Sequence, residues 1–384
     1  MSKAARAITP SRGRLFPQHM GMVARQDDRY VILNRSGMRS IVEGSICAEV
    51  DASLQQGAPT AMLLRLAPAH TALAELTSWL ATPSVPLTQL DAVRLDGFDT
   101  LFLELLGRCN ERCIHCYANA DPTVTDALDR ETALSVIGQA VELGFRRLQL
   151  TGGDPLLSEY LPDSVHRARA VGFAHVEIYT NGLALSDQLL ERLAAHRPAF
   201  AFSIYSAHAD EHDRITRTPG SHRRTLAAID RVVARGLELR AAIIVVDRAT
   251  DVAALMTLLS ERGVPEITVS RTYSVGRGEA HAVASQALPA AAGSAPGGGH
   301  RASSVQSEGT LCVTYQGDVV PCIFQRSATL GNVREGTLLE LLSRAPRTEA
   351  RGLPLAPVDD VSRRLQCTSC RLTEAGLAIL RGAR

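Results

Sequence analysis

The sequence predicts an α/β fold: a parallel sheet or barrel, with a small α+β module before it and a small cysteine-bearing module after it. Two observations predict this fold. Between residues 100 and 280, six short apolar runs alternate with longer segments of helical periodicity, and such alternation indicates a parallel sheet or barrel. Beyond the barrel, a stretch rich in Gly, Pro and Ser precedes four of the eight cysteines.

Changes in composition divide the chain into four parts. We expect an N-terminal α+β module at residues 1–95, the barrel at 96–283, a flexible linker at 284–309 and the C-terminal module at 310–384. The linker is expected because its residues are small and show no periodicity.

The elements of the barrel follow from residue type and spacing. Its strands are short and rich in β-branched or aromatic residues, at 100–107, 146–153, 175–182, 199–206, 238–246 and 266–274. Its helices begin at Ser or Asp and carry apolar residues three and four apart. They are expected at 129–144, 158–172, 186–196, 221–236 and 251–263.

The N-terminal module is expected to begin with two short strands, at 28–34 and 38–44, around an Asn-Arg-Ser-Gly turn. Helical patterns follow at 45–57 and 60–83. Cys47 lies in the first of these patterns, where a buried free thiol is the expected state.

The overall composition excludes several classes of function. Lys and Arg number 41 against 40 Asp and Glu, a net charge of +1, so a broad basic surface for nucleic acid is not expected. No apolar stretch approaches the length of a membrane span, and no apolar segment follows the N-terminal positive charges. We therefore expect a soluble cytoplasmic protein without nucleic-acid or membrane partners. In a reducing compartment the cysteines indicate metal or redox chemistry.

Seven of the eight cysteines fall into two sets. Cys109, Cys113 and Cys116 are close enough to bind one metal centre but too few for a closed structural zinc site, so a coordination position stays open. The other set has four members and suits one zinc ion or one cubane cluster. Its members are Cys312, Cys322, Cys367 and Cys370.

Chemically distinctive residues follow successive strands of the predicted barrel. The cysteine triplet follows the first strand, Gly152-Gly153-Asp154 the second and Thr180-Asn181-Gly182 the third, while Ser203 lies late in the fourth. The carboxyl ends of parallel strands share one edge, where such folds gather their chemistry. We therefore expect these residues to form one site.

The segment CNERCIHCY, a CxxxCxxC followed by an aromatic residue, resembles the cluster motif of the radical S-adenosylmethionine (SAM) enzymes. GGDP, TNG and SIY then stand where that family keeps its SAM contacts, and the resemblance covers about residues 98–280. It implies a partial six-stranded parallel (β/α) barrel. One departure is Asp154, where the family more often has Glu.

The resemblance also implies cofactors and roles. Three thiolates, from Cys109, Cys113 and Cys116, would hold a 4Fe-4S cluster whose fourth iron binds SAM, and reductive cleavage of SAM would give a 5′-deoxyadenosyl radical. A flavodoxin or ferredoxin would supply the electron. The residues expected to contact SAM are Tyr117, Gly152, Gly153, Asp154, Thr180, Ser203 and Arg214, with Arg217 as the alternative to Arg214.

The histidines near this site are not assigned to the cofactors. His115 lies between two ligands in a tight loop and is not expected to bind the cluster. His208, His212 and Asp213 follow the fourth strand, where they are interpreted as a solvated helix start or as a proton-transfer group.

The C-terminal module resembles the auxiliary-cluster domains, of SPASM or twitch type, of the same superfamily. Its marks are CVTYQGDVVPC, LGNVREGTLLELL and CTSC. The longer form of that domain uses seven cysteines for two clusters, whereas this module has four. We therefore expect a second 4Fe-4S cluster with full cysteine ligation, which favours electron transfer. A structural zinc ribbon is the alternative.

Residues 20–93 weakly resemble the RiPP recognition element, a PqqD-like winged-helix module that binds leader peptides in many peptide-modifying members of the superfamily. The segment VILNRSGMRSIVEG and the two helices after it carry the resemblance. Such a module would bind a leader peptide by strand addition and hold the core peptide at high effective concentration. A family-neutral N-terminal cap is the alternative.

Three functions are compatible with these features. The first is a maturase that abstracts hydrogen from a ribosomally made precursor peptide, installing a crosslink or thioether or oxidising a residue. The second is a small-molecule dehydrogenase or oxidase of the aminocyclitol or tetrapyrrole type. The third, a non-catalytic zinc scaffold, is disfavoured because two cluster-type cysteine sets occur together with GGDP and SIY.

Overall fold

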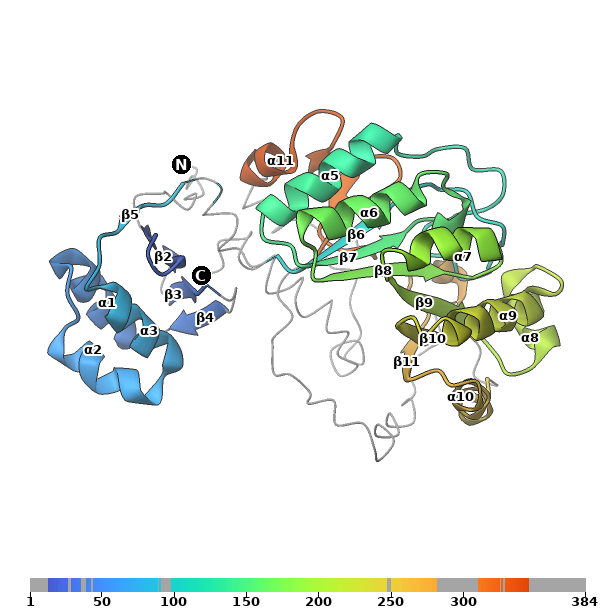
Figure 1. Ribbon diagram of the computed structural model, residues 1–384, viewed down its shortest axis with the longest axis horizontal. Helices are drawn as coiled ribbons and strands as arrows, with labels where there is room; N and C mark the ends of the chain where they lie inside the picture. The colour runs from blue at the N-terminus through green and yellow to red at the C-terminus, as the bar shows by residue number, and fades with distance from the viewer. Residues whose placement is uncertain are drawn as a thin grey trace. The chain divides into compact units, whose positions relative to one another are not determined.

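The computed structural model describes residues 13–26, 29–35, 39–42, 44–88, 90, 98–246, 250–281, 310–324, 326 and 329–344. By its contacts the chain forms an N-terminal unit, which includes the residues up to Asp99, and a core unit, which contains Thr100–Ser303 and Thr310–Leu338 (Figure 1). The predicted linker at 284–309, together with Cys367 and Cys370, lies outside the described residues.

The core unit is built on six parallel strands that pair in chain order. They are β6 (Thr100–Glu104), β7 (Arg147–Thr151), β8 (His175–Thr180), β9 (Ala199–Ile204), β10 (Leu239–Val245) and β11 (Glu266–Arg271). All six were predicted, and each ends one to three residues earlier than predicted. Within the described residues β11 is an edge strand, so the structure is a partial barrel, which confirms the predicted fold class.

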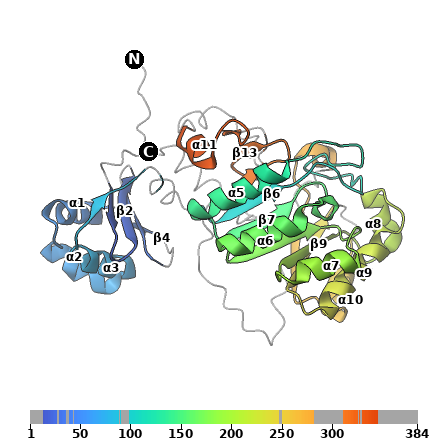
Figure 2. The same cartoon turned by 45° about the horizontal axis from the view of Figure 1, so that its top comes forward.

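Helices follow the strands as predicted and cover one face of the sheet (Figures 1 and 2). They are α5 (Arg130–Glu142), α6 (Leu161–Val171), α7 (Asp187–Ala194), α9 (Ser221–Ala234) and α10 (Val252–Glu261). Side chains of Asp129, Ser186 and Asp251 accept hydrogen bonds from the first turns of α5, α7 and α10, which satisfies amides that have no partner within the helix. An additional short helix, α8 (Ala209–Thr216), was not predicted.

The two faces of the sheet differ in polarity. Leu101, Leu103, Leu148 and Leu150 alternate along β6 and β7 and are fully or almost fully buried. The intervening positions on the neighbouring strands carry polar groups, because successive side chains of a strand point to opposite faces. The core of the unit therefore lies on the apolar face, and a polar network lies on the other.

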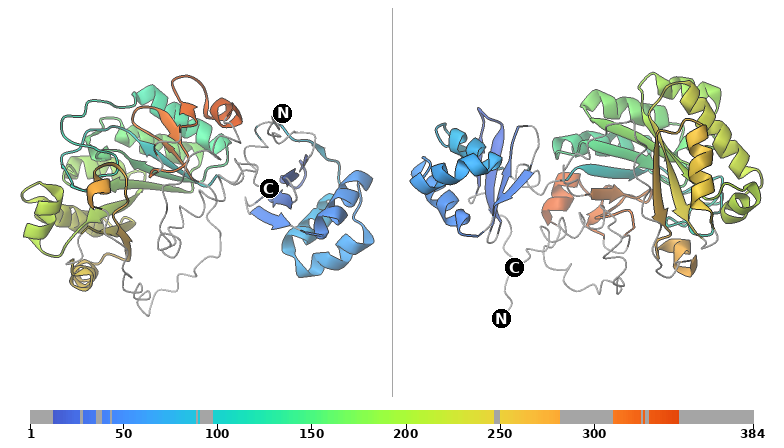
Figure 3. Two further views of the ribbon diagram at one scale, coloured as in Figure 1. Left: turned by 180° about the vertical axis from the view of Figure 1, so that it is seen from behind. Right: turned by 90° about the horizontal axis from the view of Figure 1, so that it is seen from below.

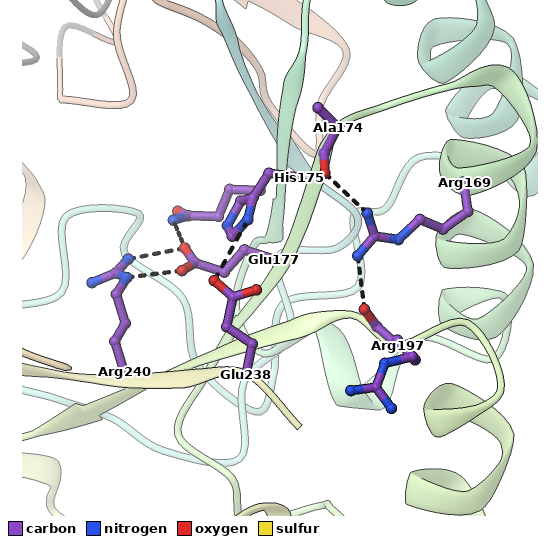
Figure 4. A network of polar contacts seen from close by, with 8 residues as sticks. Arg169, Ala174, His175, Glu177, Arg197, Glu238 and Arg240 are labelled. Atoms are coloured by element: carbon purple, nitrogen blue, oxygen red, sulfur yellow. Dashed lines mark hydrogen bonds and ion pairs between the residues drawn. The ribbon is translucent and has the colours of Figure 1, made fainter. Parts of the chain in front are cut away.

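A buried ion pair is the centre of that polar network (Figure 4). Arg240 on β10 donates from Nε and Nη2 to the two carboxylate oxygens of Glu177 on β8, at 2.8 and 2.9 Å. Gln149 Nε2 on β7 donates to the same carboxylate at 2.5 Å. Burial opposes the charge of Glu177, but the bonds and charge of Arg240 outweigh it and hold the pKa of Glu177 below its usual value. Three strands are thus joined across the sheet.

The C-terminal strands extend this sheet beyond β6 (Figure 3). β12 (Thr310–Val313) runs parallel to β6, and the antiparallel strands β13 (Asp318–Val320) and β14 (Gly331–Asn332) follow. The sequence suggested a separate module for residues 310–384. In the described residues the beginning of that module is continuous with the core sheet, because β12 takes the open edge of β6.

The N-terminal unit is a five-stranded antiparallel sheet with three helices. Its strand order is β4-β3-β2-β1-β5, and Cys47 is buried in its core as expected. The strands are β1 (Gly13–Phe16), β2 (Gly21–Gln26), β3 (Arg29–Leu33), β4 (Arg39–Val42) and β5 (Val85–Pro86), and the helices are α1 (Ile46–Gln56), α2 (Ala61–Leu66) and α3 (Thr71–Trp79).

Sequence periodicity described this unit incompletely. β3 and β4 were predicted, whereas β1, β2 and β5 were missed. The helical pattern at 60–83 is divided into α2 and α3 by a short turn at Ala67–Ala69, since Pro68 lacks the amide that a continuous helix needs. None of the helices in the described parts of the chain is long and apolar enough to cross a membrane.

Replacing Arg240 by Met should destabilise the core unit by about 3 kcal/mol, because Glu177 would be buried without its partner. Replacing both residues by apolar ones, Glu177→Leu with Arg240→Met, should restore most of the loss. Urea unfolding of the apoprotein followed by far-ultraviolet circular dichroism measures this. Fluorescence would not, since the single tryptophan, Trp79, lies in the N-terminal unit.

The pH dependence has a defined sign. The carboxyl pKa of Glu177 is lowered from 4.5, so the pair's contribution is complete above that pH and is lost as the pH falls below it. The double apolar variant should lack this acid-sensitive component. An Arg240→Met protein as stable as the wild type at neutral pH would contradict the assignment.

Candidate functional site

The three closely spaced cysteines lie on a loop at the carboxyl end of β6. We call residues 109–116 the cysteine loop. Its backbone is held by the end of α8, where Arg112 N donates to Thr216 O at 3.1 Å and Ile114 N to Ile215 O at 3.0 Å. The unpredicted helix α8 therefore fixes the path of the loop between Cys109 and Cys116.

The thiols of the cysteine loop suit a cluster. Burial is the main reason that the pKa values of Cys109 and Cys113 are raised above the usual range, so thiolates there need the positive charge of a metal. Among the described residues no three His, Cys, Asp or Glu side chains meet at a single-ion site. Each cysteine of a 4Fe-4S cube binds a different iron, so such convergence is not required.

Gly152 and Gly153 bring the loop after β7 against the start of the cysteine loop. A Cβ on Gly152 would lie 2.4 Å from Leu106 O, and one on Gly153 would lie 2.1 Å from Arg108 O. Gly153 N and Asp154 N donate to these same two carbonyls, at 2.6 and 3.0 Å. The sequence suggested that the glycines allow close approach to SAM. In the structure they are required by the contact between two backbone segments.

The Asp154 carboxylate is fully buried and joins the ends of β7 and β8. It accepts hydrogen bonds from Thr180 Oγ1 at 2.8 Å, Asn181 N at 3.1 Å and Leu156 N at 2.9 Å. Burial raises the pKa of Asp154 to about 6, although these three bonds act to lower it. Thr180 Oγ1 also accepts from Gly182 N at 2.9 Å. Two residues expected to contact SAM are therefore bonded to each other.

Asn181 links this arrangement to the first cysteine. Its Nδ2 donates to Asn110 Oδ1 at 2.7 Å and lies 3.7 Å from Cys109 Sγ. Its carbonyl accepts from Thr225 Oγ1 on α9 at 2.8 Å. In the sequence, Asn181 was noted only as part of a TNG motif. The motif does not reveal that its side-chain amide contacts the cysteine loop.

A second buried network lies behind Cys113, and sequence reasoning missed it. Ser221 Oγ donates to Glu111 and lies 3.2 Å from His212 Nε2. Tyr205 N donates to Nδ1 of His212, so Nε2 carries the proton and donates to Ser221. Burial lowers the pKa of His212 to about 3 and raises that of Glu111 to about 7. A neutral His212 is thus hydrogen-bonded to Ser221, which in turn bonds Glu111 of the cysteine loop.

Asp213, which directly follows His212, has a structural role. Its carboxylate accepts from His222 N at 2.9 Å and from Gly220 N, which closes the turn between α8 and α9. His208 is the residue before α8. The segment begins a helix, as one of the two interpretations held, but His212 is buried rather than solvated, and the proton-transfer role stays a prediction.

The remaining residues that were expected to bind SAM are dispersed. Ser203 is buried beside Tyr179 and Tyr205, and Arg214 is exposed on α8. The Tyr117 ring lies edge-on to Phe324, with ring centroids 5.4 Å apart. Tyr117 therefore contacts the C-terminal part of the core unit, and SAM contacts from all three residues stay predictions.

Cys312 and Cys322 are buried together in one apolar cluster. Next to them, Arg326 donates from Nη1 and Nη2 to the fully buried carboxylate of Glu104, at 2.6 and 3.0 Å. Glu104 is the last residue of β6, five positions before Cys109. The C-terminal segment is thus tied to the strand that carries the cysteine loop. Ligation by Cys312, Cys322, Cys367 and Cys370 stays a prediction.

A three-cysteine loop at the carboxyl edge of a partial parallel barrel is the arrangement expected for a protein that binds an iron-sulfur cluster. Residues 103–259 match the Radical SAM superfamily, and residues 306–371 match the SPASM iron-sulfur cluster-binding domain. The chain therefore carries a radical SAM domain followed by a SPASM domain. The cofactors of the first domain are a 4Fe-4S cluster and SAM, and the cofactor class of the second domain is the auxiliary iron-sulfur cluster.

Curated relatives match parts of the chain. The PqqA peptide cyclase of Xanthomonas campestris pv. campestris is 32% identical over 188 residues, 47% of this chain and 48% of the relative. The probable GTP 3',8-cyclase of Methanothermobacter marburgensis is 30% identical over 88 residues, 23% of this chain and 29% of the relative. The chain thus spans half or less of the length of these relatives.

The fold resembles that of Streptococcus suis SuiB. The structure of SuiB bound to S-adenosylmethionine superimposes with a TM-score of 0.54 at 12% identity, covering 83% of this chain and 88% of SuiB. SuiB bound to precursor peptide SuiA gives a TM-score of 0.53, also at 12% identity, with 88% of each chain covered. At these identities the likeness concerns the fold.

Replacing Asp154 by Asn should weaken SAM binding about tenfold, because the amide NH2 would face donors that the carboxylate now accepts from. The dissociation constant, measured anaerobically by titration calorimetry, tests this, with iron content as a check on the cluster. Asp163→Asn, at an exposed aspartate paired with Arg130, is the matched control. Equal affinities in the two variants would refute a role for Asp154 in shaping the SAM site.

Proposed function

We propose that this protein is a radical SAM maturase that abstracts hydrogen from a ribosomally made precursor peptide. The observation that carries the proposal is the cysteine loop, whose three thiols are buried or half-buried. It lies beside Gly152, Gly153 and Asp154 in the loop after β7. The proposed ligands of the catalytic cluster are Cys109, Cys113 and Cys116. When bound, cluster and SAM supply a 5′-deoxyadenosyl radical, while the protein supplies placement and exclusion of water.

The protein's own contribution is an array of fixed loops around the proposed cluster. Asp154 holds the ends of β7 and β8 together, and Asn181 connects them to Cys109. His212 and Ser221 support Glu111 behind Cys113. Such preorganisation counts in radical chemistry because the reacting atoms must be held in one geometry while a reactive species exists.

A peptide substrate is supported by the relatives. PqqA peptide cyclase matches 47% of this chain at 32% identity, and the name of that protein states a peptide substrate. SuiB, which shares the fold, has been crystallised with a precursor peptide. A crosslink, thioether or oxidised residue is the proposed class of product, which makes the enzyme an oxidoreductase in the broad sense.

The N-terminal unit offers a surface for leader-peptide binding. Within the described residues β4 and β5 are the edge strands of its sheet, and β4 is the longer. An edge strand presents unpaired backbone groups to which an extended peptide adds. Three helices stand between β4 and β5 in the chain. We propose that this unit holds the leader and thereby raises the local concentration of the core peptide.

The proposed auxiliary site has Cys312, Cys322, Cys367 and Cys370 as ligands of one 4Fe-4S cluster. Full ligation leaves no iron for substrate, so this cluster would transfer electrons from the substrate radical. Flavodoxin or ferredoxin would reduce the catalytic cluster. We place this chemistry in the cytoplasm, whose reducing conditions keep the thiols available.

A second candidate is a small-molecule oxidase of the tetrapyrrole or aminocyclitol type. Fe-coproporphyrin III synthase of Methanosarcina barkeri is 24% identical over 173 residues, 44% of this chain. The radical SAM domain is compatible with either substrate class. The N-terminal unit distinguishes them, because a small molecule has no leader to bind.

Anaerobic reconstitution should give about eight irons per chain, four for each cluster. Changing Cys109, Cys113 and Cys116 to Ala should reduce this to about four and abolish 5′-deoxyadenosine formation. Cys47→Ala, at a buried cysteine of the N-terminal core, should leave both values unchanged. Persistent 5′-deoxyadenosine in the triple variant would show that the cluster is bound elsewhere.

Deleting residues 1–95 should leave SAM cleavage intact and impair turnover of a leader-bearing precursor peptide. Turnover of the same core peptide without its leader should be similar in the deleted and full-length proteins. Mass spectrometry of the peptide, with 5′-deoxyadenosine as the reference, measures both. Equal turnover of the leader-bearing peptide by the two proteins would remove the leader-binding proposal.

A further inference from the structure

The segment after the last barrel strand returns to the cysteine loop. β11 ends at Arg271, and a short 3-10 helix covers Gly276–His281. Within it, Arg277 Nε donates to Cys113 O at 2.9 Å and Arg277 Nη2 donates to Ala120 O at 2.8 Å. The backbone amide of Arg277 donates to Cys116 O at 3.0 Å. One residue therefore bonds three carbonyls in and just beyond the cysteine loop.

Two glycines allow this approach. Gly276 has φ +57°, and a Cβ there would lie 2.5 Å from Tyr117 O and 2.7 Å from Cys116 O. A Cβ on Gly278 would lie 2.2 Å from Tyr273 O and 3.2 Å from His115 O. Since these neighbours are backbone atoms, a side chain on Gly276 would push the segment away from Cys116 and Tyr117. A side chain on Gly278 would clash mainly with the Tyr273 carbonyl and so distort the turn that presents Arg277.

The same segment also packs against Phe324, close to Cys322 in the chain. The ring of Tyr273 stacks on Phe324, with centroids 3.9 Å apart and planes at 17°. Phe324 in turn contacts Tyr117 edge-on. Phe324 lies two residues after Cys322, and Tyr117 directly follows Cys116. The segment thus lies against the neighbours of both cysteine sets.

The chemistry of arginine suits this position. A guanidinium is planar and presents donors in a fixed fork, so it can bond two carbonyls while fixing the distance between them. Lys has the charge but only a point-like ammonium on a flexible chain. The guanidinium bonds the carbonyls of Cys113 and Ala120, and the backbone amide bonds that of Cys116. Cys113 and Cys116 are proposed ligands, so fixing their backbone restricts where the two sulfur atoms can lie.

We propose that Arg277, with Gly276 and Gly278, forms a clamp that positions Cys113 and Cys116 for the SAM-binding state of the cluster. Arg277 is a positioning residue: it acts through the cysteine loop and touches no reacting atom. The inference rests on the proposed ligand set but does not depend on the substrate. Its consequence is that the geometry of the cluster site is determined partly from outside the cysteine motif, more than 160 residues along the chain.

Arg277→Lys and Arg277→Gln test the clamp together. Both should raise the dissociation constant for SAM and slow formation of 5′-deoxyadenosine by about tenfold to a hundredfold, the effect of a small misplacement of reacting groups. Both should also alter the electron paramagnetic resonance spectrum of the reduced cluster and its change on adding SAM. A general loss of stability would not alter that spectrum in the remaining folded protein. Arg262→Gln, at an arginine paired with Asp230 on the helical side, is the control.

The two substitutions separate geometry from charge. If Arg277→Lys matches the wild type while Arg277→Gln does not, charge alone matters and the clamp is refuted. If both match the wild type in SAM affinity and spectrum, the proposal is also refuted. Loss of iron from either variant, with an unchanged circular dichroism spectrum of the apoprotein, supports the clamp because the loop then fails to present its thiols.

Gly276→Ala provides an independent arm that keeps the arginine. It should reproduce the loss of SAM affinity and increase hydrogen exchange of the apoprotein in residues 113–120. Gly236→Ala is the matched control, since Gly236 has φ +61° with no atom within 4 Å of a built Cβ. Equal exchange and equal SAM affinity in the two alanine variants would overturn the proposal. The triple cysteine variant tests the ligand set separately, so the two failures are distinguishable.

Discussion

The buried carboxylate of Asp154 is the interaction on which the rest of the site depends. It joins the ends of two neighbouring strands through Thr180 and Asn181, while its own backbone amide is bonded to the carbonyl of Arg108, the residue before Cys109. A fully buried charge is costly unless it is hydrogen-bonded, and three donors satisfy this one. The ends of β7 and β8, the loop that carries Gly152 and Gly153, and the backbone before Cys109 are therefore held together.

The C-terminal strands complete this body. β12 pairs with β6 in parallel register. The Glu104–Arg326 ion pair adds a side-chain link between β6 and the C-terminal segment. The cysteine loop and Cys312, which lies opposite Phe102 in the register, consequently border one sheet. An auxiliary cluster placed by these cysteines would be held by the same strand that carries the cysteine loop. That arrangement is suited to electron transfer between two fixed centres, which depends on a constant separation.

Much of the fold was accessible from sequence because its signals are local. Apolar runs alternating with capped helices predicted all six barrel strands and five of their helices, and the spacing of Cys109, Cys113 and Cys116 predicted the cluster motif. α8 was missed because its eight residues, ADEHDRIT, carry few apolar positions. The strands β1 and β2 pair locally, with each other and with β3, but they were missed because GRLF and GMVARQ are short and mix polar with apolar residues. Pro68 was visible in the sequence, and its effect on the helix at 60–83 was underestimated.

The sequence by itself indicated the class of chemistry, since three closely spaced thiols leave a coordination position of a metal centre open and their motif resembles that of the radical SAM enzymes. The tertiary structure alone decided how that motif is held. Asp154 and Thr180, which the motif suggested as separate SAM contacts, are bonded to each other, and the glycines meet backbone atoms. Asn181, His212 and Ser221 acquire roles only through folding. The physical reason is that ligand identity depends on spacing along the chain, whereas support depends on hydrogen bonds between loops that only the packed sheet brings within reach.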